Sequence, residues 1–225
     1  MKNLITIGLP SKGRLKEKAV AFFNDRGLKV LQSSKERNYF ASIENKPNIK
    51  IIYLHAKEII QRLGDGTLDL GISGLDLLNE SEKNLQNKIR IKQKLDFGEA
   101  NLVVAVPDDW IDVQTVADLE EVAFDIRLKK NARLRVATKY PNLTNNFLIS
   151  KGVTQYKLVS SLGATETYPF IGSSEIITDI TSTGKTLEDN NLRVLKDGLI
   201  LKSTACLFIA KKKAANLQHF LNSFD

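Results

Sequence analysis

Residues 176–187 have the composition of a phosphate-binding turn. The stretch begins with the β-branched run Ile176-Ile177-Thr178, typical of a buried strand, and continues with small hydroxylated residues around Gly184 before a segment that could begin a helix. Such a loop can direct backbone N–H groups and hydroxyls to one point at the positive end of a helix, where a phosphate binds. An ordinary strand-to-helix turn with a Ser or Thr cap has the same composition, and the loop alone leaves both interpretations open.

Asp179 lies directly before this loop, where a carboxylate cannot favour an anion. We therefore expect it to face hydroxyl groups of the ligand, or a metal ion carried by the ligand. The fragment Gly184-Lys185-Thr186 resembles the end of a nucleotide P-loop, whose first glycine should lie five positions before Gly184. Asp179 occupies that position, so the sequence excludes a Walker-type loop.

A second loop suited to anions follows the first predicted strand. Residues 4–9 alternate between apolar and polar types, and a helix is predicted to follow the loop and to end at Gly27. Lys12 and Arg14 stand at the start of this helix, where positive charge does not favour the helix dipole. Cations in that position favour an anionic ligand, and ordinary solvated side chains are the alternative.

A third strand–turn–helix connection resembles the second. Residues 68–74 predict a buried strand that leads into a glycine-flanked turn, and Asp76 begins the short helix after it. Asp76 fits a ligand-binding role and an ordinary first-turn acid equally well. In open α/β sheets, ligands bind at strand ends of this kind.

Strands and helices alternate along the chain, which predicts the α/β class. The other predicted strands are 38–44, 49–54, 89–95, 101–106, 134–138, 156–160, 192–197 and 203–210, and the other helices are 56–63 ending at Gly64, 115–128, 143–150 and 213–222. Ligand-suited loops in both halves predict two lobes with the active site in a cleft between them. The first lobe is expected to contain residues 1–95 and 188–225, and the second residues 96–187.

Composition limits the partners. The 33 basic and 26 acidic residues give a net charge of +7, but the basic residues are dispersed and the densest run, at 211–213, is interpreted as a solvated face. This pattern favours small anionic substrates over nucleic acid. No apolar run approaches the ~18 residues of a membrane span, and Cys206, the single cysteine, lies in an apolar run that predicts a core thiol. We therefore expect a cytoplasmic protein without membrane or nucleic-acid partners.

Six segments together resemble the ATP phosphoribosyltransferase family, and in particular its short form without a C-terminal regulatory domain. They are PSKGRL at 10–15, LDLGISGLDL at 68–77, LDFG at 95–98, VATKYPNL at 136–143, GATE at 163–166 and DITSTGKTLEDNNL at 179–192. The resemblance covers nearly the whole chain. It implies a two-lobed fold similar to the type II periplasmic binding proteins, which agrees with the cleft inferred above.

The resemblance also implies roles for individual residues. The 5-phosphate of phosphoribosyl pyrophosphate would be held by Thr181, Ser182, Thr183, Gly184, Lys185 and Thr186. Glu166 and Asp179 match acids near the ribose hydroxyls. The positions around the nucleotide and the pyrophosphate are Lys12, Gly13, Arg14, Leu15, Asp76, Leu77 and Tyr140. Lys12, Arg14, Arg37 and Asp179 are the residues predicted to act in catalysis.

The implied reaction is attack of adenine N1 of ATP on the anomeric carbon of the ribose, with inversion and loss of pyrophosphate. No Ser-His-Asp or Cys-His set is needed, because ATP supplies the nucleophile. Mg²⁺ would arrive with the pyrophosphate, and His55 and His219 are too few and too far apart in sequence for a zinc site. Many members of the family carry an arginine where this chain has His55, and Arg37 or Lys57 is expected to take over its role.

The resemblance further implies a homo-oligomer that assembles with a regulatory subunit similar to histidyl-tRNA synthetase. After residue 210 the sequence has room for one amphipathic helix, so the chain alone is expected to be insensitive to histidine. The alternative is a small-anion binding or sensing module of the same fold without catalysis. A signal peptide or a helix-turn-helix segment would favour that alternative, and the sequence shows neither.

Overall fold

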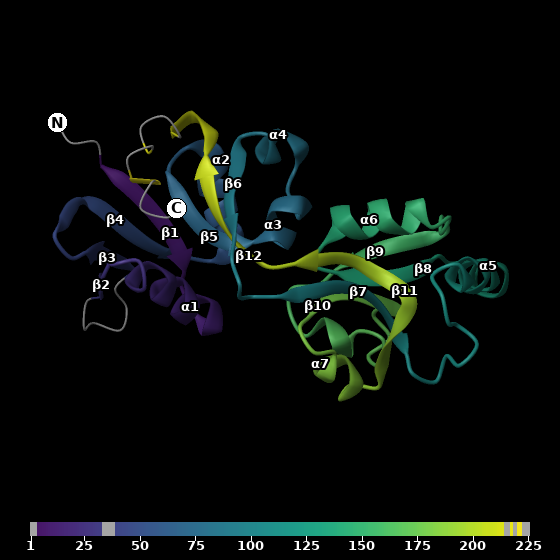
Figure 1. The fold of residues 1–225 in the computed structure, drawn as a ribbon. Coiled ribbons are helices and arrows are strands. Elements are labelled where there is room, and N and C mark those ends of the chain that lie inside the picture. The colour runs from purple at the N-terminus through teal and green to yellow at the C-terminus, as the bar shows by residue number, and fades with distance from the viewer. Residues whose placement is uncertain (1–3, 33–38, 214–216, 218–219, 222–225) are drawn as a thin grey trace. The chain divides into compact units, whose positions relative to one another are not determined.

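The structure, a computed structural model, describes residues 4–32, 39–213, 217 and 220–221. The chain forms two compact units (Figure 1). The first contains Met1–Gly98 and Thr204–Asp225, and the second contains Glu99–Ser203. Each unit is built on its own β-sheet.

The first unit has a seven-stranded mixed sheet in the order β2-β3-β4-β1-β5-β12-β6. Its strands are β1 (Ile5–Pro10), β2 (Val30–Gln32), β3 (Phe40–Ile43), β4 (Lys46–Leu54), β5 (Leu70–Gly74), β6 (Ile89–Lys94) and β12 (Ala205–Ala210). β1 pairs in parallel with β4 on one side and β5 on the other. The carboxyl ends of these three strands therefore lie at one edge of the sheet.

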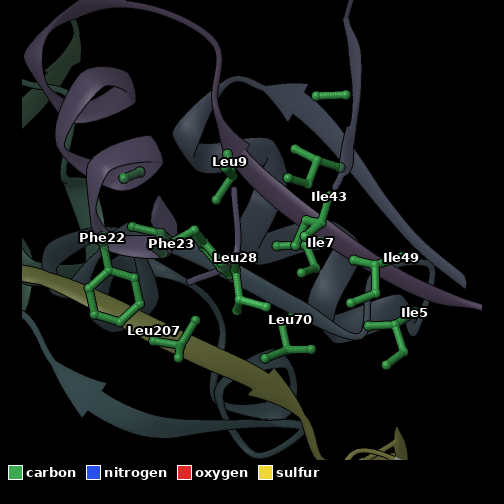
Figure 2. Packing of buried hydrophobic residues seen from close by; sticks show 14 of the residues in the cluster. Ile5, Ile7, Leu9, Phe22, Phe23, Leu28, Ile43, Ile49, Leu70 and Leu207 are labelled. Atoms are coloured by element: carbon green, nitrogen blue, oxygen red, sulfur yellow. The ribbon is translucent and has the colours of Figure 1, made fainter. Parts of the chain in front are cut away.

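Both faces of this sheet are buried. Along β12, Leu207 and Ile209 join the cluster that contains Phe22 and Phe23 of α1 (Gly13–Asn24), as Figure 2 shows for Leu207 and the two phenylalanines. Cys206 and Phe208 alternate with them and join the cluster under α2 (Ala56–Asp65) on the other face. Two short helices, α3 (Leu75–Glu80) and α4 (Lys83–Gln86), follow β5. Because successive side chains of a strand point to opposite faces of the sheet, alternate residues of β12 pack into two different cores.

Two glycines let α2 approach its face of the sheet. A Cβ atom at Gly8 of β1 would lie 2.5 Å from Leu68 Cδ1, and one at Gly71 of β5 would lie 2.5 Å from Ile59 Cγ2. Real Cβ contacts are longer, so a side chain at Gly8 would displace Leu68, and one at Gly71 would displace Ile59 of α2. The glycines let Ile59 and its apolar neighbours stay buried against the sheet. Each buried Ile or Leu stabilises the fold by about 1.5–3 kcal/mol.

The second unit has a five-stranded sheet in the order β11-β7-β10-β8-β9. The strands are β7 (Ala100–Pro107), β8 (Leu134–Thr138), β9 (Tyr156–Ser160), β10 (Ile176–Thr181) and β11 (Leu192–Ser203), and the helices are α5 (Asp118–Lys130), α6 (Pro141–Ser150), α7 (Lys185–Glu188) and the 3₁₀ turn η1 (Thr165–Thr167). β8 runs parallel to both β9 and β10. Val104 and Val106 of β7 face one core, while Val103 and Ala105 face the other.

The predicted lobe boundaries need correction. Residues 188–203 were expected in the first lobe, but β11 pairs with β7 along its length and belongs to the second unit. The junctions lie at Gly98/Glu99 and Ser203/Thr204 rather than at 95/96 and 187/188. Only β12 and the segment after it return to the first unit, and most of the helix predicted at 213–222 lies outside the described residues.

Other predicted ends also moved. Residues 192–197 were expected to form a complete strand, but β11 continues through Gly198 to Ser203. α2 continues past Gly64 to Asp65 and is capped by Gly66, whose φ of 83° gives the left-handed conformation common at helix ends. In the described part of the chain no helix is both long enough and apolar enough to span a membrane.

Candidate functional site

The second unit brings most of its predicted site residues to one edge of its sheet. Because β8, β9 and β10 are parallel, their carboxyl ends lie together. The strands β8, β9 and β10 are labelled in Figure 1. Tyr140 follows β8, Glu166 lies in η1 after β9, and Asp179 lies near the end of β10. The loop predicted to bind phosphate begins where β10 ends, at Thr181.

Three buried threonine hydroxyls join these elements, and none of them was among the predicted site residues. Thr178 Oγ1 of β10 lies 2.6 Å from Thr138 Oγ1 of β8 and 2.7 Å from Thr144 Oγ1 of α6. The Tyr140 N–H donates to Thr138 Oγ1 at 2.9 Å, which ties the start of α6 to the strand. We call Thr138, Thr144 and Thr178 the threonine triad. The sequence signal would have been a threonine after apolar residues in each strand, Thr138 after Val136 and Ala137 in β8 and Thr178 after Ile176 and Ile177 in β10.

Asp179 is the most unusual ionisable group of this edge. Its side chain is 13% exposed, and its Oδ1 accepts the Ile180 N–H at 2.8 Å. Burial raises the pKa of the Asp179 carboxyl, and the negative charge of Glu166 raises it further, whereas the Ile180 N–H and the ammonium of Lys139 lower it. The net result is a carboxyl with a raised pKa beside a second acid, as expected of a group that awaits polar ligand atoms.

The hydroxyls of the phosphate loop already bond to the loop's own backbone. Thr181 Oγ1 accepts the Gly184 N–H at 2.9 Å, and Thr183 Oγ1 accepts the Lys185 N–H at 3.3 Å. Each hydroxyl keeps its own hydrogen for donation to an anion. Gly184, with φ of 81°, turns the chain into α7. Because α7 is a single turn of four residues, its dipole adds little, and the expected contribution of a helix end to phosphate binding is not supported.

Three other loop residues have different surroundings. The Ser182 hydroxyl donates to the Glu99 carbonyl at 3.2 Å, so it fixes the loop to the start of β7. Lys185 Nζ lies 3.6 Å from Asp189 Oδ1, and both side chains are exposed. Thr186 is exposed beside them. The Asp189 carboxylate therefore already neutralises part of the positive charge with which Lys185 would attract an anion.

The first unit gathers its predicted residues at the edge formed by β1, β4 and β5. Lys12 is the N-cap of α1, with no side-chain cap, and Arg14 follows it in a first turn that contains no acidic residue. Both side chains are exposed, and neither forms an ion pair with a residue that the structure describes. Gly13 begins the helix with φ of 72°. The turn thus presents two cations beside the open N–H groups of a twelve-residue helix, which suits an anion.

Asp76 in the same edge is held close to the backbone. It is 6% exposed, and its Oδ1 would lie 2.2 Å from a Cβ atom at Gly74, so only glycine fits beneath the carboxylate. Leu77 packs against the core under α2, and Leu15 packs against the core under α1. Their side chains therefore contribute first to packing.

His55 acts as the N-cap of α2, because its Nδ1 accepts the Lys57 N–H at 3.3 Å. This contact gives the imidazole a structural role where many relatives were expected to carry arginine. Arg37, predicted to take over the role of that arginine, lies outside the described residues. Among the described residues, no group of three or more His, Cys, Asp or Glu side chains could hold a metal ion.

Comparison with known proteins identifies the family. The family model described as ATP phosphoribosyltransferase matches residues 55–224. An ATP phosphoribosyltransferase of Brucella melitensis is 48% identical over 209 residues, which cover 92% of this chain and 90% of the relative. A second, from Brucella anthropi, is 47% identical over 213 residues, or 94% of this chain and 92% of the relative.

The chain belongs to the ATP phosphoribosyltransferase family. An ATP phosphoribosyltransferase is a pentosyltransferase that joins the phosphoribosyl group of phosphoribosyl pyrophosphate to N1 of ATP in the first step of histidine biosynthesis. The predicted enzyme class is confirmed, and the family match decides against a binding module without catalysis.

Solved structures support the fold. The ATP phosphoribosyl transferase (HisG:HisZ) complex from Thermotoga maritima aligns with a TM-score of 0.73 and 23% identity, covering 98% of this chain and 96% of that one. The arginine-bound form of truncated ArgBP from Thermotoga maritima aligns with a TM-score of 0.54 and 13% identity, over 99% and 94% of the two chains. The ATP phosphoribosyltransferase fold of this chain is thus similar to that of periplasmic binding proteins, as predicted.

Proposed function

We propose that the two strand edges divide the substrates between them. The edge of the second unit would hold the phosphoribosyl group, with the 5-phosphate bound by the loop of residues 181–186 and with the threonine hydroxyls of that loop as donors. Asp179 and Glu166 would accept hydrogen bonds from the ribose hydroxyls. The observation that carries this assignment is the position of Asp179: its largely buried carboxylate lies two residues before a loop whose hydroxyls still have hydrogens to donate.

The edge of the first unit would hold the pyrophosphate and the nucleotide. Lys12 and Arg14 stand at an N-terminus that lacks acidic residues, which suits the charge of both groups. Gly13, Leu15, Asp76 and Leu77, together with Tyr140 of the second unit, would surround the nucleotide. Arg37 stays a predicted catalytic residue.

Catalysis would come from position and charge. Adenine N1 supplies the nucleophile, so the protein needs to align it with the anomeric carbon. The Asp179 carboxylate would favour positive charge that develops on the ribose, and Lys12 and Arg14 would favour negative charge on the leaving pyrophosphate. We propose that Mg²⁺ is bound by the pyrophosphate oxygens and enters with the substrate, since its preferred ligands are oxygens.

The direct test is pyrophosphate release by the purified chain supplied with ATP, phosphoribosyl pyrophosphate and Mg²⁺. We expect release that requires both substrates, together with a product whose mass equals ATP plus a phosphoribosyl group. Reactions without ATP or with the Asp179→Asn variant are the controls. Release that does not depend on ATP, or no adduct, would contradict the proposal.

We further propose a regulatory partner similar to the HisZ component of the Thermotoga maritima complex. Its test is co-purification of the chain with a coexpressed subunit similar to histidyl-tRNA synthetase. The initial rate should then fall with added histidine only in the complex. Inhibition of the isolated chain by histidine would place the effector site on this chain instead.

A further inference from the structure

We propose that Lys139 is a positioning residue for the transfer reaction, because its ammonium group holds the Asp179 carboxylate in the place that the ribose requires. In the segment VATKYPNL, the sequence predicted a site role for Tyr140 and none for Lys139, the residue before it. The inference rests on the proposed function, and specifically on the role of Asp179.

The register of the sheet brings the two residues together. In the parallel pairing of β8 with β10, Thr138 lies opposite Thr178, and their hydroxyls are 2.6 Å apart. Asp179 is the next residue of β10, and Lys139 is the first residue after β8. Because side chains alternate between the faces of a sheet, Asp179 lies on the face opposite the threonine triad, where the Lys139 ammonium contacts it. The triad therefore fixes the backbone positions from which the two side chains extend.

The contact itself is asymmetric. Lys139 Nζ lies 3.9 Å from Asp179 Oδ1, and the lysine side chain is 37% exposed while that of the aspartate is 13% exposed. A flexible, hydrated cation thus covers a carboxylate that has lost most of its water. Such a pair is worth more than an exposed one, because the charge that it satisfies is already desolvated.

The charged groups around Asp179 give the lysine a specific task. Glu166, from η1, disfavours the ionised carboxylate, and Lys139 favours it. On α7, the ammonium of Lys185 lies against Asp189 instead. Burial already raises the pKa of Asp179, so removal of the lysine charge should raise it further and leave less carboxylate ionised at a given pH.

The test compares Lys139→Gln with Lys151→Gln. Lys151 has the same 37% side-chain exposure and forms a closer ion pair, 2.9 Å from Asp197, so its removal controls for loss of a lysine in the same unit. We expect Lys139→Gln to lower kcat about fivefold, the equivalent of about 1 kcal/mol, and to move the acidic limb of the kcat–pH profile to higher pH. Lys139→Arg should restore both, and Lys151→Gln should match the wild type.

A second pair of variants tests whether the lysine acts through Asp179. In an Asp179→Asn background, where no carboxylate is left to position, Lys139→Gln should cause no further loss of kcat. A fivefold loss that persists in that background would overturn the inference, as would a Lys139→Gln enzyme with normal kcat and an unmoved pH profile. A wild-type chain that forms no adduct would instead overturn the proposed function itself.

Discussion

The two strand edges of this protein differ in how much of their structure exists before a substrate binds. In the second unit, the threonine triad joins two strands and a helix, and the loop hydroxyls accept backbone N–H groups at 2.9 and 3.3 Å. In the first unit, Lys12 and Arg14 are exposed on an uncapped helix start. The edge of the second unit is therefore preorganised, whereas the side chains of Lys12 and Arg14 in the first unit become ordered when a ligand binds.

This difference has an energetic meaning. A preorganised site loses little side-chain entropy on binding, while each long side chain that becomes ordered costs about 0.5–1.5 kcal/mol. We therefore expect the second unit to determine the geometry of the reacting ribose. The first unit should supply charge that adapts to phosphate groups.

The largest effect is expected at Asp179. Replacement by Asn keeps the size of the side chain and removes its charge, so kcat should fall about 100-fold while substrate affinity changes much less. Because burial raises the pKa of Asp179, wild-type kcat should also decline with falling pH at a pH above the ordinary range of an aspartate. Steady-state kinetics across pH measures both, and a raised KM with normal kcat would show that Asp179 only binds.

The next effect concerns the phosphate loop. Replacing Thr183 and Thr186 by Val removes two hydroxyls that would donate to the 5-phosphate, at ~1.5–3 kcal/mol for each bond to a charged acceptor. Affinity for phosphoribosyl pyrophosphate should fall at least about tenfold by titration calorimetry. Thr154→Val is the control, since its hydroxyl bonds to Glu120 at 3.1 Å and belongs to a different part of the unit. Unchanged affinity in the folded double variant would refute the loop assignment.

A smaller effect, on stability, tests preorganisation directly. Thr178→Val keeps the side-chain volume but removes the partner that both other triad hydroxyls share in a buried site. The contact of 3.1 Å between the Thr138 and Thr144 hydroxyls and the bond from the Tyr140 N–H to Thr138 would remain. The free energy of unfolding in urea should fall by about 1–3 kcal/mol. Thr154→Val, at an exposed position, should change it by no more than about 0.5 kcal/mol. Equal effects of the two substitutions would show that the triad adds nothing.

The sequence predicted the elements better than their ends. The first helix was expected to stop at Gly27, and the structure has α1 ending at Asn24 with Gly27 at φ of 71°. The second helix was expected to end at Gly64, which is wrong because Gly66 is its cap. The helix continues through Gly64, which packs closely on Leu85. Local composition cannot decide which of two neighbouring glycines adopts positive φ, because the answer depends on packing.

The same limit explains what was missed in the site. The loop at 181–186 and Asp179 could be proposed from sequence because their chemistry is local in sequence. The triad could not, because its members are separated by up to 40 positions and meet only through the strand register. The placement of residues 188–203 failed for a related reason. They were assigned to the first lobe because the chain after residue 187 is too short to form a lobe of its own, whereas β11 pairs with β7 of the second unit, with shifts in register between Val194 and Leu201.

The division of the substrate between the two edges is tested most directly by binding its two halves separately. Titration calorimetry with ribose 5-phosphate and with inorganic pyrophosphate would compare the wild type, Thr183→Val/Thr186→Val and Lys12→Gln/Arg14→Gln. The account predicts that the loop variant loses affinity for ribose 5-phosphate alone and that the Lys12/Arg14 variant loses affinity for pyrophosphate alone. The reverse pattern, or equal losses for both ligands in both variants, would contradict it.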